Sequence, residues 1–364
     1  MSRRVKNFNA GPAALPLSAL ERAQAELIDF QGTGMSVMEH SHRGKDYEGV
    51  HFEAIALLKK LLGLSDEHHV LLLQGGARLQ FAMMPMNLLH RGKKGYYAVT
   101  GTWAKQAYEE GAIVGDAVVA ATTEENKAFR RVPRMDELEV DPRDAAYLHI
   151  TSNNTLFGTQ WPSYPSFDGV PLIADMTSDL LSRPIDPARF GMIYAAAQKN
   201  VGPAGVTVVI VRKDLVAGAR KDIPAALRYE SYASADSLWN TPPTFAIYVM
   251  RHSLAALEAM GGVDAIAALN VRKAKLLYDV VDAHAGFYRC PVEPASRSQM
   301  NVVFRLPSEE LEKAFLKQAE ANEMMGLKGH RSVGGVRASL YNFVELGWVE
   351  ALADFMRSFA AKNG

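Results

Sequence analysis

Lys199 and Asp175 are the two residues of this sequence whose types and spacing best suit catalysis. Lys199 follows the apolar run 192–197 and opens a turn that contains Gly-Pro-Ala-Gly at 202–205. Asp175 ends an earlier apolar run, 170–174. An amine and a carboxylate at corresponding ends of two successive strands suit pyridoxal phosphate (PLP). That cofactor needs an amine to form its Schiff base and a carboxylate to keep its ring nitrogen protonated.

Each of these residues, taken alone, also has an ordinary structural interpretation. A lysine after a strand is commonly a solvated turn charge, and Asp175 could equally cap the element that follows it. The combination of Asp175, Gln198 and Lys199 with a flexible glycine-rich turn favours the cofactor over these alternatives.

Short apolar runs alternate with longer helix-like segments along most of the chain, and this alternation predicts an α/β fold. The runs are apolar on both faces, as are the strands of a mostly parallel sheet covered by helices. In such a sheet we expect ligands beyond the carboxyl ends of the strands. The seven runs are residues 70–73, 95–99, 117–120, 147–150, 170–175, 192–197 and 206–211.

The character of the chain changes after residues 240–244. Two long helical stretches follow, roughly 245–260 and 263–283, and then a mixed α/β tail from about residue 286. This change predicts two domains. We expect a segment 1–18 near the active site, a large cofactor-binding domain 19–260 and a small C-terminal domain 261–364.

Bulk composition excludes several classes of function. The chain has 364 residues, 48% of them hydrophobic, with 40 basic and 40 acidic side chains, so it lacks the positive charge of a nucleic-acid-binding protein. No apolar run approaches the roughly 20 residues of a membrane helix, and no signal peptide is evident. One cysteine, Cys290, permits neither an internal disulfide nor a multi-cysteine metal site. We predict a cytoplasmic protein without a metal, whose partners are small molecules or a second copy of itself.

Other polar residues at the predicted strand ends suit the same cofactor. The segment 74–81 combines strand, glycine turn and helix start, so backbone N–H groups near Ala77 and Arg78 could bind a phosphate. Trp103 could lie flat against a pyridine ring, although core packing is the usual role of tryptophan. Thr155 and Gln198 offer hydrogen bonds, or are ordinary loop residues.

Two basic clusters suit anionic substrates. Residues 39–45 include His42 and Arg43, and residues 328–337 include His330, Arg331 and Arg337. Guanidinium groups bind carboxylate and phosphate oxygens through two parallel hydrogen bonds. Solvated basic loops are the alternative. The histidines could suggest a metal, but no carboxylate or thiolate set accompanies them.

These residues lie in longer motifs that resemble the phosphoserine aminotransferase family, fold type I PLP enzymes of aminotransferase class V. The resemblance extends over nearly the whole chain. It implies a large domain with a mostly parallel central sheet and a smaller C-terminal α/β domain. The motifs are residues 8–13, 36–45, 74–81, 197–205, 240–244, 328–331 and 334–339.

The resemblance implies a role for each cofactor residue. Lys199 would bind PLP covalently, and Asp175 would pair with its ring nitrogen. Trp103 would stack on the ring. The polar substituents would be bound by Thr155 and Gln198, and the phosphate would lie at Ala77 and Arg78.

The family's active site lies at a dimer interface, so the resemblance also implies a homodimer. Asn240 and Thr241 would reach the cofactor phosphate of the partner subunit. The substrate's phosphate or distal carboxylate would be bound by His42, Arg43, His330 and Arg331, and its α-carboxylate by Arg337.

The reaction implied is reversible amino transfer between glutamate and 3-phosphooxypyruvate, which gives O-phospho-L-serine and 2-oxoglutarate in L-serine biosynthesis. Some relatives also act on 4-phosphohydroxy-L-threonine in pyridoxine biosynthesis, and this second substrate stays open. The alternatives are another fold type I enzyme, such as an alanine–glyoxylate aminotransferase or a cysteine desulfurase, and a non-catalytic anion-binding relative. Ala10, Ala77 and Asn154 depart from the residues common in the family, which leaves fine substrate contacts open.

Overall fold

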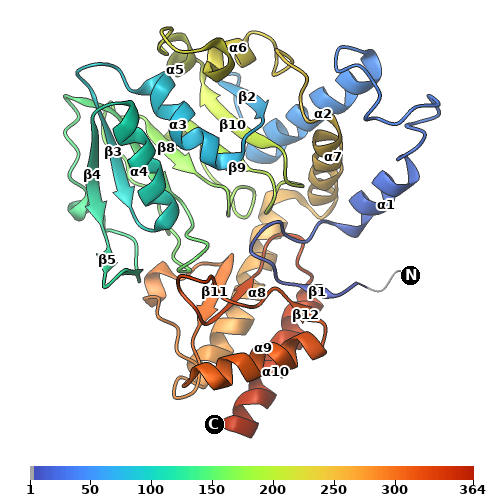
Figure 1. The fold of residues 1–364 in the computed structure, drawn as a ribbon, viewed down its shortest axis with the longest axis vertical. Coiled ribbons are helices and arrows are strands. Elements are labelled where there is room, and N and C mark those ends of the chain that lie inside the picture. Colours follow the sequence, from blue (N-terminus) through green and yellow to red (C-terminus); the bar gives the residue numbers. More distant parts are fainter. Residues whose placement is uncertain (1–3) are drawn as a thin grey trace.

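The computed structural model describes residues 4–364, and its central element is a seven-stranded sheet (Figure 1). The strand order is β2-β10-β9-β8-β7-β3-β4. Only β10 runs antiparallel to its neighbours, whereas the remaining pairs are parallel. The strands are β2 (His68–Leu73), β3 (Lys94–Val99), β4 (Ala117–Thr122), β7 (Ala145–Thr151), β8 (Leu172–Asp175), β9 (Met192–Ala196) and β10 (Thr207–Arg212). Each coincides with one of the seven apolar runs, and the predicted α/β class is confirmed.

Helices cover both faces of this sheet because its strands bury side chains on both sides. In β7, Leu148 and Ile150 enter one core, whereas Tyr147 enters another. The first core includes residues of α2 (Lys45–Leu62) and α7 (Thr244–Ala259). The second includes residues of α3 (Gly76–Leu88) and α4 (Thr102–Val114).

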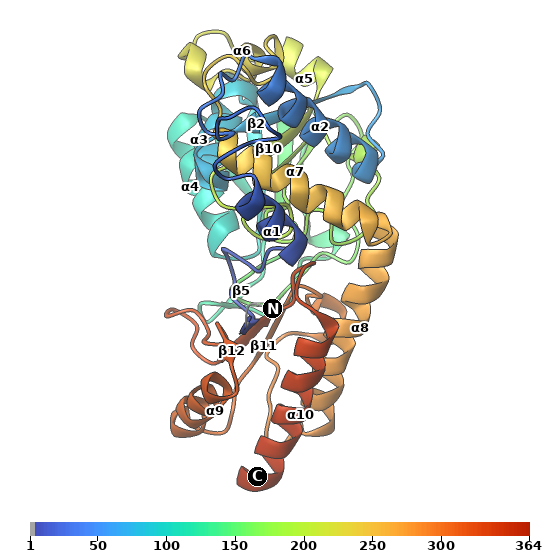
Figure 2. The same ribbon diagram turned by 90° about the vertical axis from the view of Figure 1, so that its right-hand side faces the viewer.

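A third core holds the C-terminal part of the chain together. It joins α8 (Gly262–Ala283), α9 (Glu309–Ala321) and α10 (Leu346–Asn363) to an antiparallel pair, β11 (Asn301–Phe304) and β13 (Val336–Ser339). Figure 2 shows α10 lying along α8 at the end of the molecule away from the large sheet. The division of the chain at residue 261 stays a prediction, and this separate core supports it.

The N-terminal segment connects the two parts. Its strand β1 (Lys6–Asn7) pairs in parallel with β12 (Met324–Met325), and Phe8 and Ala14 belong to the third core. The other elements are α1 (Leu17–Ala25), α5 (Lys213–Ala217), α6 (Tyr229–Ala233), β5 (Glu124–Glu125), β6 (Ala128–Phe129) and the 3₁₀ turns η1 (Met135–Glu137), η2 (Pro187–Arg189), η3 (Ala225–Leu227) and η4 (Pro294–Ser296).

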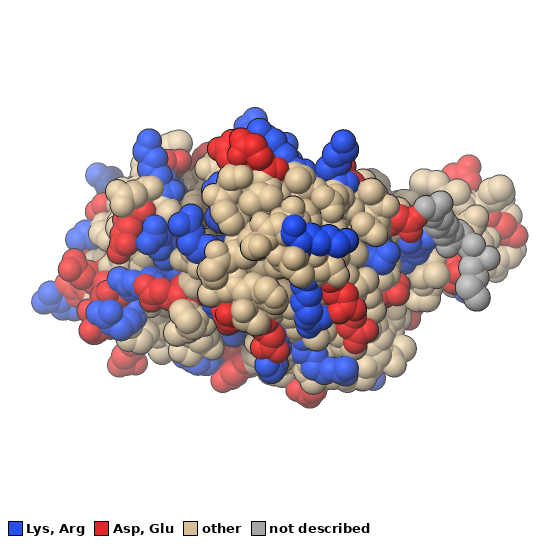
Figure 3. Space-filling view, turned by 90° about the horizontal axis from the view of Figure 1, so that it is seen from below, with Lys and Arg blue, Asp and Glu red and all other residues tan. Residues whose placement is uncertain are grey.

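Charge is mixed over the face shown in Figure 3, where lysines and arginines alternate with acidic side chains. Within residues 4–364, no single helix has both the length and the apolar character needed to cross a membrane. The pair α7 and α8, bent by 80°, meets that test only when its two helices are taken together.

Candidate active site

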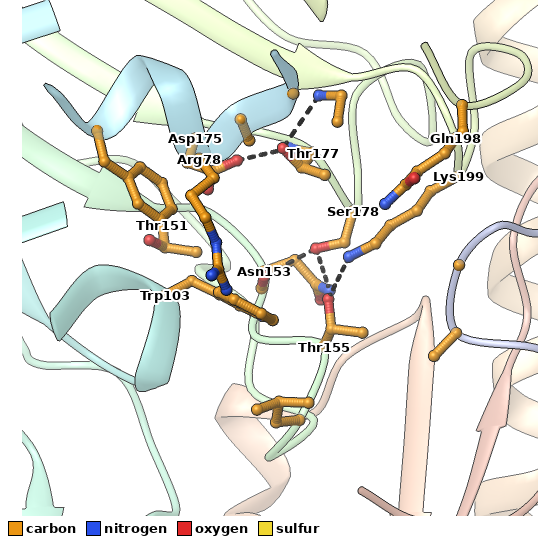
Figure 4. A pocket seen from close by; sticks show the side chains of 18 of the residues that line it. Arg78, Trp103, Thr151, Asn153, Thr155, Asp175, Thr177, Ser178, Gln198 and Lys199 are labelled. Atoms are coloured by element: carbon orange, nitrogen blue, oxygen red, sulfur yellow. Dashed lines mark hydrogen bonds between the residues drawn. The ribbon is translucent and has the colours of Figure 1, made fainter. Parts of the chain in front are cut away.

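A cavity of about 440 Å³ lies at the carboxyl ends of the parallel strands (Figure 4). It receives residues from the ends of β7, β8 and β9 and from the first turns of α3 and α4. The lining residues are Ala10, Gly11, Gly76, Ala77, Arg78, Phe81, Trp103, Thr151, Asn153, Thr155, Leu156, Asp175, Thr177, Ser178, Ala196, Gln198, Lys199, Ala204, Gly205, Val206, His330 and Arg337. The predicted residues that follow or end β2, β3, β7, β8 and β9, namely Ala77, Trp103, Thr155, Asp175 and Lys199, therefore contribute to one site.

Lys199 is a buried amine. It lies in the turn after β9, only 8% exposed, and its Nζ donates a 2.6 Å hydrogen bond to Thr155 Oγ1. The side chain points across the cavity toward Thr155 (Figure 4). Burial lowers the pKa of Lys199 to about 8, with Asp175 opposing this shift and Arg337 adding to it. The ordinary interpretation, a solvated turn charge, is wrong for this residue.

Asp175 is the last residue of β8 and is also buried. Burial raises its pKa, while hydrogen bonds from Thr177 and the positive charge of Lys199 act in the opposite direction. One of these bonds runs from the Thr177 backbone N–H to Asp175 Oδ1, at 2.9 Å. A buried carboxylate of this kind is stabilised when it faces a cation, which a protonated ring nitrogen would supply.

The glycine turn before α3 forms the predicted anion cradle. Gly75 and Gly76 have φ of 89° and 68°, in the left-handed region where glycine is favoured. A Cβ on Gly75 would lie 2.5 Å from a methyl carbon of Leu79, so this turn has no room for a side chain there. The first N–H groups of α3 therefore stay exposed to the cavity.

Arg78 and Trp103 lie together beside this cradle. The guanidinium carbon of Arg78 is 5.7 Å from the centre of the Trp103 ring. This contact keeps the positive charge of Arg78 next to the flat ring of Trp103, near the N-terminus of α3. Ala77 and Gln198 also line the cavity.

Arg337 and His330 bring the C-terminal part of the chain into the same site. Arg337 is 8% exposed, and its Nη1 donates to the Thr155 carbonyl at 3.3 Å. Its Nε has no partner among the described residues. A buried guanidinium with an unused donor is suited to a carboxylate.

Sequence reasoning assigned no role to four polar residues of the cavity, although it expected one of them, Asn153, at a strand end there. Thr151 ends β7, and its buried hydroxyl lacks a partner in the described part of the chain. Asn153 and Ser178 bond each other at 2.9 Å, and Thr177 supports Asp175. All four lie within four residues of a predicted strand end. A search for polar residues after each strand would have found them.

Five of the predicted residues lie outside this cavity: His42, Arg43, Asn240, Thr241 and Arg331. Two of them are neighbours, because Thr241 Oγ1 lies 3.3 Å from His42 Nδ1. His42 and Arg43 precede α2, Asn240 and Thr241 precede α7, and Arg331 lies in the loop before β13.

Asn154 supports the site without lining it. Its Nδ2 donates to the Thr100 carbonyl at 2.7 Å, and its Oδ1 accepts from the Leu156 N–H at 3.2 Å. A Cβ at Gly101 would lie 2.1 Å from this amide nitrogen. Asn154 therefore fixes the loop that carries Thr155, while Ala10 and Ala77 border the cavity itself.

The donor set of this cavity fits PLP. It combines a buried amine, a buried carboxylate, an exposed helix N-terminus, a flat indole and an unpartnered buried hydroxyl at Thr151. Within residues 4–364, no group of three or more histidine, cysteine or acidic side chains is placed to hold a metal ion.

Comparison with known proteins agrees with this chemistry. The family described as aminotransferase class V matches residues 5–352. The phosphoserine aminotransferase of Lysinibacillus sphaericus (strain C3-41) is 53% identical over 363 residues, which cover 100% of both chains. This chain belongs to the phosphoserine aminotransferase family.

Solved structures of the family have the same fold. The phosphoserine aminotransferase of Bacillus circulans subsp. alkalophilus is 53% identical, superposes with a TM-score of 0.97 and covers 100% of both chains. The PLP-bound phosphoserine aminotransferase of Trichomonas vaginalis is 37% identical with a TM-score of 0.93, and the match covers 97% of this chain and 100% of that one. The predicted resemblance and fold type are therefore confirmed.

Proposed function

We infer that this chain is a PLP-dependent phosphoserine aminotransferase. It transfers an amino group reversibly between glutamate and 3-phosphooxypyruvate, which gives O-phospho-L-serine and 2-oxoglutarate. The observation that carries this conclusion is the buried pair Lys199 and Asp175 in one cavity, in a chain that matches family members over its full length.

Different residues of the cavity would bind different parts of PLP. Lys199 would hold it covalently, Asp175 would face its ring nitrogen, and the α3 N-terminus with Arg78 would face its phosphate. When bound, PLP supplies an electron sink for the carbon that bears the amino group. Trp103 would cover one side of the ring and exclude water from it.

Lys199 is also suited to move a proton. Its lowered pKa leaves a sizeable neutral fraction near pH 8, so the amine can both accept and return a proton at the substrate carbon. A positioned group of this kind contributes about 10²–10⁴-fold to a rate. Arg337 would bind the α-carboxylate through its unused Nε, and His330 would meet the other end of the substrate.

We propose further that the active site is completed by a second copy of the chain. His42, Arg43, Asn240 and Thr241 lie outside the cavity of their own chain. Six large apolar side chains between residues 17 and 38 are exposed, among them Ile28 at 85%. Large exposed apolar side chains that gather in one segment are consistent with an interface. These observations support a homodimer in which the four polar residues serve the partner's cavity. The cytoplasmic location stays a prediction.

Mixing two inactive variants tests the shared site. A Lys199→Ala chain and an Arg43→Ala chain each lose activity alone, but a heterodimer of the two retains one intact cavity. Random reassociation should then recover about a quarter of wild-type activity, because half the dimers carry one working site of two.

The matched control mixes Lys199→Ala with Asp175→Asn, two changes within the same cavity. No heterodimer of that pair has an intact site, so activity should stay absent. Equal absence of recovery in the Arg43 mixture would place Arg43 in the cavity of its own chain and refute the sharing.

A comparison of amino donors tests the reaction itself. With 2-oxoglutarate as acceptor, O-phosphoserine should react efficiently, because one set of cationic side chains is available for its carboxylate and another for its phosphate. Alanine lacks the phosphate and should be a poor donor. Efficient use of alanine would favour an alanine–glyoxylate aminotransferase instead. The rate with phosphohydroxythreonine would settle the second substrate.

A further inference from the structure

A second cavity of about 430 Å³ lies beside the active site. It is lined by strand β6 with Arg130, residues 156–157, the segment 289–291, strand β11 with Arg305, the loop 329–334 and the start of β13. It shares only Leu156 and Arg337 with the active-site cavity. Its size falls within the range of small-molecule sites, roughly 300–1,000 Å³.

The lining of this second cavity is strongly basic. It includes Arg130, Arg289, Arg305 and Arg337 but no aspartate or glutamate. Arg305 is balanced by Glu312, with Nε and Oε1 2.5 Å apart. The side chains of Arg130 and Arg289 make no hydrogen bond or ion pair with any residue from 4 to 364. Three guanidinium charges around one cavity thus lack a counter-charge.

Backbone pairing holds two of these arginines side by side. Arg289 and Arg305 form an antiparallel bridge, with N–H to carbonyl distances of 2.9 Å in both directions. Residues directly opposite in such a pair project to the same face, where like charges repel. Glu312 offsets the charge of Arg305 but not that of Arg289, so an anion beside this pair would neutralise Arg289.

One loop forms a wall of both cavities. Gly329, Val333 and Gly334 line the second cavity, whereas His330 lines the active site. Arg305 Nη1 donates to the Val333 carbonyl at 3.2 Å, so the basic cluster is bonded to this loop. A ligand in the second cavity would therefore touch the segment that presents His330 and Arg331.

We propose that this cavity is a second anion site, which binds a phosphate dianion, either free or as a small phosphate ester. Guanidinium groups match phosphate oxygens through paired hydrogen bonds. Arg130 and Arg289, both exposed, supply uncommitted donors. Arg337, whose Nε is assigned to the substrate, adds a buried positive charge between the two cavities. This site goes beyond the transamination and is measured by binding, so its failure would leave the proposed function untouched.

Calorimetric titration of the holoenzyme with inorganic phosphate tests the proposal. The wild-type protomer should bind phosphate at two sites, one in each cavity. The double variant Arg130→Gln/Arg289→Gln should keep the active-site event and weaken the other at least about tenfold, the change expected from losing one charge-assisted hydrogen bond. Both side chains are exposed, so the variant should fold normally.

A matched variant, Arg91→Gln/Arg272→Gln, removes two exposed arginine charges elsewhere on the surface. It should bind phosphate as the wild type does. Equal weakening in both double variants would show a general charge effect and overturn the site, as would a single phosphate per wild-type protomer.

A second titration identifies the source of the dianion. 3-Phosphoglycerate carries a phosphate ester and a carboxylate but neither an amino nor an oxo group, so it cannot enter the transamination. Tighter binding of this ester than of inorganic phosphate, lost in Arg130→Gln/Arg289→Gln, assigns the site to phosphorylated acids. Equal affinity assigns it to free phosphate, and both results support the site.

Discussion

Two buried lysines, Lys199 and Lys273, have similar electrostatics and different surroundings. Burial lowers the pKa of Lys199 to about 8 and that of Lys273 to about 7. Among residues 4–364, Lys199 Nζ has one hydrogen-bond partner, the Thr155 hydroxyl, and it borders a cavity. Lys273 donates to the carbonyls of Leu340, Tyr341 and Val344, at 3.0, 2.8 and 3.3 Å. A lowered pKa alone therefore does not identify the reactive lysine, because reaction also needs space beside the nitrogen.

The three carbonyls around Lys273 match the three N–H donors of an ammonium group, and so favour the charged form that burial opposes. The three carbonyls belong to the turn after β13, and other residues of this turn contact segments that border the active site. In that turn Tyr341 donates to the Ala10 carbonyl at 2.9 Å, and the Asn342 N–H donates to Asn200 Oδ1 at 3.0 Å. Lys273 thus acts on the site only through the position of the residues next to Lys199.

The largest expected difference between the two lysines is in activity. Lys199→Ala should lower turnover by more than about 10⁴-fold, since it removes both the covalent attachment and the proton-transferring group. After borohydride treatment and dialysis, the wild type should keep the reduced cofactor covalently attached, seen by its near-ultraviolet absorbance, whereas the purified variant should keep none. Lys273→Ala should keep that covalent attachment. Multiple turnovers by Lys199→Ala would refute its role.

The second difference is in stability. Lys273→Met keeps the apolar stem but leaves three buried carbonyls without their donor, which should lower the free energy of unfolding by about 3 kcal/mol. Lys199→Met removes a single hydrogen bond and should cost about 1 kcal/mol or less. Urea unfolding of the two apoproteins measures both values. Equal losses would show that Lys273 is not a structural anchor.

The sequence alone predicts that Lys199 lies at a strand end in a binding site, but it does not predict that Lys273 is buried. Apolar runs and the residues that end them are local features, so the sequence predicted the seven strands. The residues expected at five of their carboxyl ends line one cavity, and their roles stay predictions. Lys273 lies in a helix, where lysine is ordinarily solvent-exposed. Its partners are 67 to 71 residues away in the sequence, and no local pattern records such a contact.

The same limit applies to the neighbours of the second cavity. The bridge between Arg289 and Arg305 joins two segments that carry no motif. The basic cluster 328–337 was visible in the sequence, but its division between two cavities was not, because that division depends on which way the loop faces. Similarly, the sequence named His42 and Thr241 separately, and only the fold shows them as neighbours.

The smallest expected effect is in the pH dependence of cofactor attachment. Only the neutral amine attacks an aldehyde, and burial lowers the pKa of Lys199 to about 8. The rate at which the apoprotein takes up PLP covalently should therefore rise about tenfold per pH unit below pH 7 and level off above about pH 8. An exposed lysine would instead keep gaining reactivity toward pH 10.

Stopped-flow absorbance between pH 6 and 9.5 follows this uptake, with Lys273→Met as the control. The control should reproduce the wild-type midpoint, because Lys273 faces carbonyls and not the cavity. A midpoint that moves with the change at 273 would assign the titration to the structural lysine. A rate that still rises at pH 9.5 would mean that the Lys199 amine is solvated before PLP arrives. The two lysines would then differ in the burial of the amine as well as in the free space beside it.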